Sequence, residues 1–156
     1  MKQLMMIWGL ALSAMAGQVW SQTVADRLQV VDPYVRAVPP GQPNSASFLA
    51  LRNTADAAHA LVGAESPVAE VVELHTHIEK DGMLSMRQVE RIELPAGQTV
   101  ELRPGGFHVM LLGLKERLTP GEKVPVRLLF EDGSSLDIQA EVRKLNMGMR
   151  KMQQSH

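Results

Sequence analysis

The sequence predicts a single all-β domain, built as a sandwich or a barrel. Turn signals made of Gly, Pro, Asn and Asp recur at short intervals, the apolar segments between them are short, and none keeps a helical period. At 156 residues the chain is long enough for one domain with a hydrophobic core. The turn signals are residues 32–33, 39–44, 81–82, 95–97, 103–106, 119–121 and 132–133.

Short strands are expected between these turns. The last two show the pattern most clearly, because apolar side chains alternate with others from Val124 to Phe130 and again from Leu136 to Val142, as in half-buried strands. The turn at residues 132–133 joins them into a closing hairpin. In chain order the expected strands are residues 28–31, 47–53, 60–65, 71–79, 83–94, 99–102, 108–112, 123–130 and 136–142.

The N-terminus has the layout of a secretory signal peptide. Lys2 precedes an apolar run from Leu4 to about Ala16, which is too short for a membrane span, and small residues follow. Cleavage after Ala16 and cleavage after Ser21 both fit. We therefore expect a signal peptide over residues 1–21, a domain over 22–145 and a flexible tail over 146–156. The prediction is an exported, periplasmic protein without stable membrane insertion.

Charge and composition exclude several function classes. The net charge is -1, with 16 basic and 17 acidic residues, so nothing favours a nucleic-acid partner. The chain has no cysteine, which removes disulfides, lipid attachment through cysteine, iron–sulfur ligation and the thiolate of a blue-copper centre. No Ser-His-Asp pattern, phosphate-binding glycine loop or H-E-x-x-H motif is present, and we expect no enzyme activity.

Methionine and histidine gather in two places. Beyond residue 21, Met83, Met86 and Met110 lie among His75, His77 and His108, while Met147, Met149 and Met152 share the tail with His156. Side chains two apart on a strand share a face, which pairs His108 with Met110 and His75 with His77.

A turn at residues 80–82 folds the following segment back beside these histidines. One register of that hairpin places His77 opposite Met86, and the other places His75 there. Met86 is on the histidine face in both registers, and Met83 is on the opposite face. Glu73 and Glu79 alternate with the histidines, so either could orient an imidazole.

Two imidazoles and two thioethers favour Cu(I), because thioether is a poor ligand for Zn²⁺, Ca²⁺ or Mg²⁺. Two alternatives stay open. The same residues could pack in a secreted β-sandwich that binds other proteins and has no metal role. The tail residues Met147, Met149, Met152 and His156 fit either a second copper site or a solvated segment.

The spacing from His75 through Met86 and His108 to Met110 resembles the H-x10-M-x21-H-x-M signature of the periplasmic CuA chaperone (PCuAC) family. The segments 34–36, 46–48, 73–75, 106–111 and 118–121 are also similar to that family, and the likeness covers about residues 27 to 143. One departure is His77, where relatives often have methionine.

The resemblance implies a cupredoxin-like β-barrel that carries Cu(I) at its surface and supplies cytochrome c oxidase assembly, especially the CuA centre. It gives the ligand role to His75, Met86, His108 and Met110. His77, where this chain departs from the family, could add a nitrogen ligand or take part only when Cu(II) binds as a second ion. The expected partner is a copper-accepting oxidase subunit or another assembly chaperone, and the chain is expected to be a monomer. A copper-sequestering or resistance protein would use the same ligands, so delivery and storage stay open.

Overall fold

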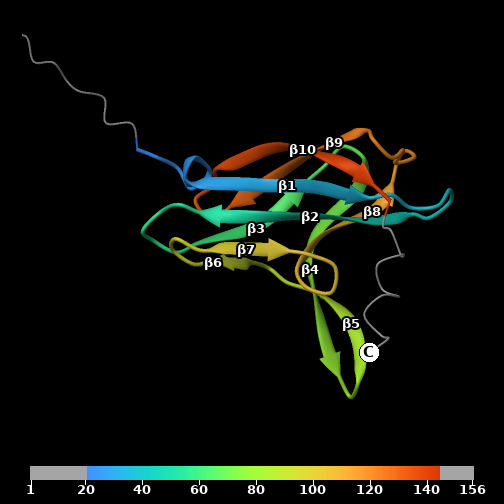
Figure 1. The fold of residues 1–156 in the computed structure, drawn as a ribbon, viewed down its shortest axis with the longest axis horizontal. Helices are drawn as coiled ribbons and strands as arrows, with labels where there is room; N and C mark the ends of the chain where they lie inside the picture. Colours follow the sequence, from blue (N-terminus) through green and yellow to red (C-terminus); the bar gives the residue numbers. More distant parts are fainter. Residues whose placement is uncertain (1–20, 145–156) are drawn as a thin grey trace, which may run out of the picture.

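The computed structural model describes residues 21–144, which form an all-β domain with one 3-10 turn (Figure 1). The fold class predicted from the turn spacing is therefore confirmed. After the turn η1 (Ala25–Arg27), the strands are β1 (Leu28–Arg36), β2 (Asn44–Asn53), β3 (His59–Glu65), β4 (Ala69–Lys80), β5 (Met83–Gln88), β6 (Ile92–Leu94), β7 (Thr99–Leu102), β8 (His108–Leu114), β9 (Lys123–Phe130) and β10 (Ser135–Arg143). Within the described residues no helix has the length and apolar character needed to cross a membrane.

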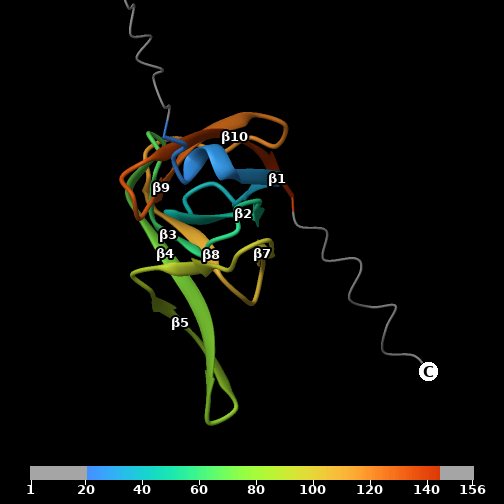
Figure 2. The same cartoon turned by 90° about the vertical axis from the view of Figure 1, so that its left-hand side faces the viewer.

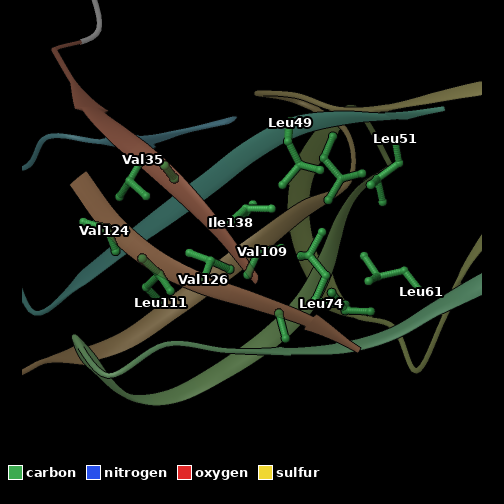
Figure 3. Packing of buried hydrophobic residues seen from close by; sticks show 14 of the residues in the cluster. Val35, Leu49, Leu51, Leu61, Leu74, Val109, Leu111, Val124, Val126 and Ile138 are labelled. Carbon is green, nitrogen blue, oxygen red and sulfur yellow. The ribbon is translucent and has the colours of Figure 1, made fainter. Parts of the chain in front are cut away.

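The strands follow one continuous hydrogen-bonded path, β5-β4-β8-β2-β1-β10-β9-β3-β6, with β7 attached to β2. The path folds over on itself, so that Leu74, Val109 and Leu51 from one half pack in the same core cluster as Val126 and Ile138 from the other (Figure 3). Burial of this apolar surface is the main favourable contribution to folding.

The closing hairpin forms as predicted. β9 and β10 pair antiparallel, with Val126 opposite Ile138 and Val124 opposite Ala140. In β9 every second residue from Val124 to Phe130 is buried, which is the alternation read from the sequence. β10 differs only at Leu136, which is partly exposed beside the hairpin turn.

Two predicted boundaries are wrong. Residues 32–33 do not end a strand, because β1 continues through them with a register shift between Val31 and Tyr34 and a positive φ of 49° at Asp32. The turn signal marks a β-bulge, which interrupts pairing locally without ending the strand. The segment 83–94 is two strands, since β5 pairs with β4 and β6 pairs with β3.

The hairpin of β4 and β5 extends beyond the rest of the domain (Figure 2). Its two-residue turn has positive φ at both positions, 54° at Asp81 and 74° at Gly82, the conformation that matches the twist of a tight hairpin. This turn fixes the register, and His77 pairs with Met86 while His75 pairs with Gln88. Of the two registers open from the sequence, the first is therefore observed.

Candidate metal centre

The candidate site lies on the outer face of β5, β4 and β8. Leu74 and Val109 point into the core, and their neighbours His75 and His108 therefore point to the other side of the sheet. His75 and His108 are directly opposite each other in the antiparallel pair of β4 and β8, as are Glu73 and Met110. The pairing of adjacent strands thus brings together residues that are 33 positions apart in the numbering.

The three histidines form a compact group around His108. The ring centroid of His108 lies 5.8 Å from that of His75 and 5.2 Å from that of His77. The centroid of the His108 ring also lies 6.2 Å from that of Phe48. Among residues 21–144, however, no three histidine or carboxylate side chains form a group placed to hold a metal ion by themselves. A metal site here therefore depends on the neighbouring thioethers.

A surface hollow of about 430 Å³ brings thioethers and imidazoles to one place. Met86 comes from β5, His77 from β4, and His108 with Met110 from β8. His75 does not line the hollow, although its ring contacts the group through His108. Of the four residues that match the motif, three line the hollow directly, and His77 lines it as well.

His108 is held as a neutral imidazole. His108 is only 2% exposed, and its Nδ1–H donates a hydrogen bond to the carbonyl oxygen of Gly106 at 3.0 Å. Burial lowers the pKa of His108, the Gly106 hydrogen bond opposes this, and His77, His75 and Arg36 lower it further. With the proton on Nδ1, the lone pair of Nε2 is available to a ligand.

Within residues 21–144, the other two histidines each have a nitrogen without a hydrogen-bond partner. His75 Nε2–H donates to Glu73 Oε2 at 2.7 Å, which leaves the lone pair on Nδ1. The Nδ1 atoms of His75 and His77 are buried and have no hydrogen-bond partner among the described residues. A buried nitrogen without a partner is costly, and binding a soft cation would satisfy it.

Met86 and Met83 differ in position as the sequence predicts. Met86 is 52% exposed beside His77, whereas Met83 is 73% exposed and pairs with Lys80 near the hairpin tip. Met83 is three residues from Met86 and so projects from the opposite face of β5. The tail residues Met147, Met149, Met152 and His156 lie outside the described residues, as do residues 1–20.

Sequence reasoning did not single out the aromatic support of the site. Phe48 is 2% exposed and lies between Tyr34, at a centroid distance of 5.2 Å, and His108. Arg36 covers the Phe48 ring with its guanidinium carbon 5.5 Å from the centroid, and it also lines the hollow. The alternation of Tyr34 and Arg36 on one strand is the signal that could have placed them on this face.

Comparisons with known proteins find a matching family and individual relatives. A family model described as "Putative lipoprotein LpqE-like" matches residues 28–142. A putative lipoprotein of Leifsonia xyli subsp. xyli is 38% identical over 120 residues, covering 76% of this chain and 71% of that protein. An uncharacterized protein of Rickettsia prowazekii is 29% identical over 104 residues, covering 66% of this chain and 58% of that protein.

Solved structures show the same fold. The solution structure of Cu(I)-DR1885 from Deinococcus radiodurans is 35% identical, with a TM-score of 0.62, covering 83% of this chain and 85% of that chain. The apo form of DR1885 is 34% identical, with a TM-score of 0.61, covering 92% of this chain and 96% of that chain. The apo PCuAC domain from PmoF1 is 25% identical, with a TM-score of 0.66, covering 76% and 95%.

Proposed function

This chain belongs to the LpqE-like family, which is of the PCuAC type, and on that premise we propose that it is an exported copper chaperone that carries Cu(I) on the outer face of β4, β5 and β8. The observation that supports this most is the convergence of His77, Met86, His108 and Met110 on one hollow beside His75. Imidazole nitrogen and thioether sulfur form a ligand set suited to Cu(I).

Each motif residue has a distinct part in this proposal. His108 and His75 bind the ion through ring nitrogens whose tautomers are set by Gly106 and Glu73. Met110 binds from the same strand as His108, and Met86 binds from the exposed hairpin. His77 is a fifth candidate ligand, and as a third imidazole it would also serve Cu(II), for which nitrogen ligands are suitable.

Exposure of the site favours transfer of the ion over permanent storage. Half of Met86 is accessible to solvent at the mouth of the hollow, and the hairpin that carries it stands away from the domain (Figure 1). An incoming ligand from another protein can therefore contact the ion before Met86 leaves it. A neutral thioether binds without the strong charge attraction of a thiolate, which lowers the barrier to this exchange.

We propose a respiratory oxidase subunit that assembles a CuA centre, or another assembly chaperone, as the acceptor. The chain would act in the periplasm as a monomer after removal of a signal peptide that ends at Ala16 or Ser21, and it would catalyse no reaction. Although the family is described as lipoproteins, these 156 residues contain no cysteine to which a lipid could be attached. The tail residues Met147, Met149, Met152 and His156 are proposed as a secondary copper site.

Anaerobic titration with Cu(I) against a competing chelator tests this function. We expect one tight equivalent in the exported chain, its loss in His108→Ala plus Met110→Ala, and its retention in a version ending at Lys144. Equal weak binding by all three proteins would reject the copper assignment and favour a β-sandwich that binds other proteins. Incubation of the Cu(I)-loaded chain with a purified acceptor domain then separates delivery from sequestration.

A further inference from the structure

Arg36 has an unusual position at the border of the hollow. Its guanidinium lies over the Phe48 ring, and its Nε atom is buried without a hydrogen-bond acceptor among the described residues. None of the ion pairs within residues 21–144 includes Arg36. Burying a guanidinium N–H without an acceptor costs free energy, so a ligand that accepts a hydrogen bond from Arg36 would be favoured at this position.

Arg143 on the adjacent strand β10 indicates the chemistry of such a ligand, because its guanidinium binds carboxylates. Arg36 and Arg143 are paired residues of the parallel strands β1 and β10, and each guanidinium covers an aromatic ring, Phe48 and Tyr34 respectively. Arg143 donates to both carboxylate oxygens of Asp32, at 3.0 and 2.7 Å, and to Glu141 at 3.4 Å. Arg36 and Arg143 thus place two positive charges side by side. Among the described residues, carboxylates neutralise only the charge of Arg143.

The lining of the hollow also favours an anion. Among residues 21–144, Arg36 is the only formally charged residue that lines it, and no carboxylate does. The neutral polar side chains of Gln42 and Asn44 lie alongside, and the Asn44 Oδ1 already accepts a hydrogen bond from the backbone N–H of Gly113. The amide nitrogen of Asn44 is therefore available as a second donor.

We propose that the hollow binds a carboxylate group through the guanidinium of Arg36, with Asn44 and Gln42 as additional donors. The planar fork of arginine matches the two oxygens of a carboxylate, and the cation–π contact with Phe48 favours one position of that fork before binding. The carboxylate comes either from a small free acid or from a Glu or Asp side chain presented by another protein. This site shares the hollow with the proposed copper ligands but requires no bound metal, so it can be tested in the metal-free chain and its failure is distinguishable from failure of the copper proposal.

Nuclear magnetic resonance of the metal-free, ¹⁵N-labelled exported chain tests the site. Sodium acetate is titrated against sodium chloride at equal ionic strength, while the Nε–H of Arg36 and the backbone N–H of Gly105 are followed. We expect saturable shifts with acetate only. Arg36→Gln should weaken acetate binding at the Gly105 signal by about tenfold or more, the loss expected for a charged hydrogen-bonded pair. Arg36→Lys, which keeps the charge, should retain part of the binding.

Arg143→Gln is the matched control, because Arg143 already has its carboxylates, and acetate should bind this variant as it binds the native chain. The amide spectrum of each variant reports whether it is folded. Shifts that chloride reproduces, or that persist unchanged in Arg36→Gln, would overturn the proposal. A second titration with acetyl-Gly-Glu-Gly-amide and its Gln analogue distinguishes the sources: tighter binding of the Glu peptide than of acetate assigns a protein side chain, and equal binding assigns a small free acid.

Discussion

Glu73 and His75 lie two residues apart on one face of β4, and the Glu73 carboxylate accepts a hydrogen bond from His75 Nε2–H at 2.7 Å. The bond fixes the tautomer of His75 and leaves the lone pair on Nδ1. His108 has the opposite arrangement, because its Nδ1–H donates to Gly106 and its Nε2 is the available nitrogen. The two opposed histidines are thus oriented by different partners.

Glu73→Ala should weaken Cu(I) binding by about 10- to 100-fold, the usual effect of removing a group that orients a metal-binding histidine. Competition against a chelator measures the affinity. Glu79→Ala is the control, because Glu79 lies on the same strand but is exposed near the hairpin tip, opposite Leu84. Equal losses in both variants would show that strand charge, and not orientation of His75, sets the affinity.

Met86→Leu should lower the affinity for Cu(I) by at least tenfold, or about 1.4 kcal/mol, because leucine fills a similar volume and removes the sulfur donor. Met83→Leu should leave the affinity unchanged, since Met83 pairs with Lys80 near the hairpin tip and projects from the face of β5 opposite to Met86. The same chelator competition compares the two. A larger loss in Met83→Leu would mean that the hairpin changes register when it binds the ion.

His77→Met should preserve Cu(I) binding and weaken Cu(II) binding, because it exchanges an imidazole for a thioether at the edge of the hollow. Electron paramagnetic resonance of the Cu(II)-loaded chain measures the number of coupled nitrogens. We expect the native chain to show one more coupled nitrogen than the variant. Identical spectra would exclude His77 as a ligand of Cu(II).

The metal-free chain should lose stability as the pH falls below about 6.5, the ordinary pKa of histidine. Burial depresses the pKa of His108, so between the folded pKa and 6.5 the unfolded chain binds a proton that the folded chain does not. The free energy of unfolding therefore rises with pH across this window, by at most about 1.4 kcal/mol per pH unit for one group. Urea unfolding at a series of pH values measures the slope.

His108→Asn should flatten this pH dependence, because asparagine does not titrate. The difference in slope between the two proteins isolates the contribution of His108 from that of carboxylates elsewhere. A native slope equal to that of the variant would contradict the expected burial of a neutral imidazole.

Local sequence patterns predict much of the fold, but they misplaced two strand boundaries. The alternation from Val124 to Phe130 gave the correct strand and the correct buried face, because that pattern reports directly on a sheet with one side in the core. A proline after Asp32 suggested a turn, yet β1 continues as a bulged strand because β2 pairs with it on both sides of the irregularity. Pairing partners far along the chain are not visible in local sequence.

The candidate site was likewise only partly predictable from the sequence. Strand periodicity placed His75 with His77, His108 with Met110, and Met86 on the histidine side of its hairpin. It left two registers open, and the positive φ values at Asp81 and Gly82 give the register with His77 opposite Met86. The apposition of His75 and His108, by contrast, depends on β4 pairing with β8.

The sequence by itself determined the strand periods, the absence of thiol ligands and the spacing of histidine and methionine, because these depend on residue type and on the two-residue repeat of a strand. Only the tertiary structure decided that Phe48 supports His108, that Glu73 and Gly106 select the tautomers, and that Arg36 stands unpaired, among the described residues, beside the hollow. Phe48 and His108, like Arg36 and most of the hollow, come from strands that are distant in the chain, and long-range pairing and packing alone bring such strands together. Glu73 and Gly106 are each two residues from the histidine that they orient, and there the structure decided the geometry of the hydrogen bond, which residue type alone does not determine.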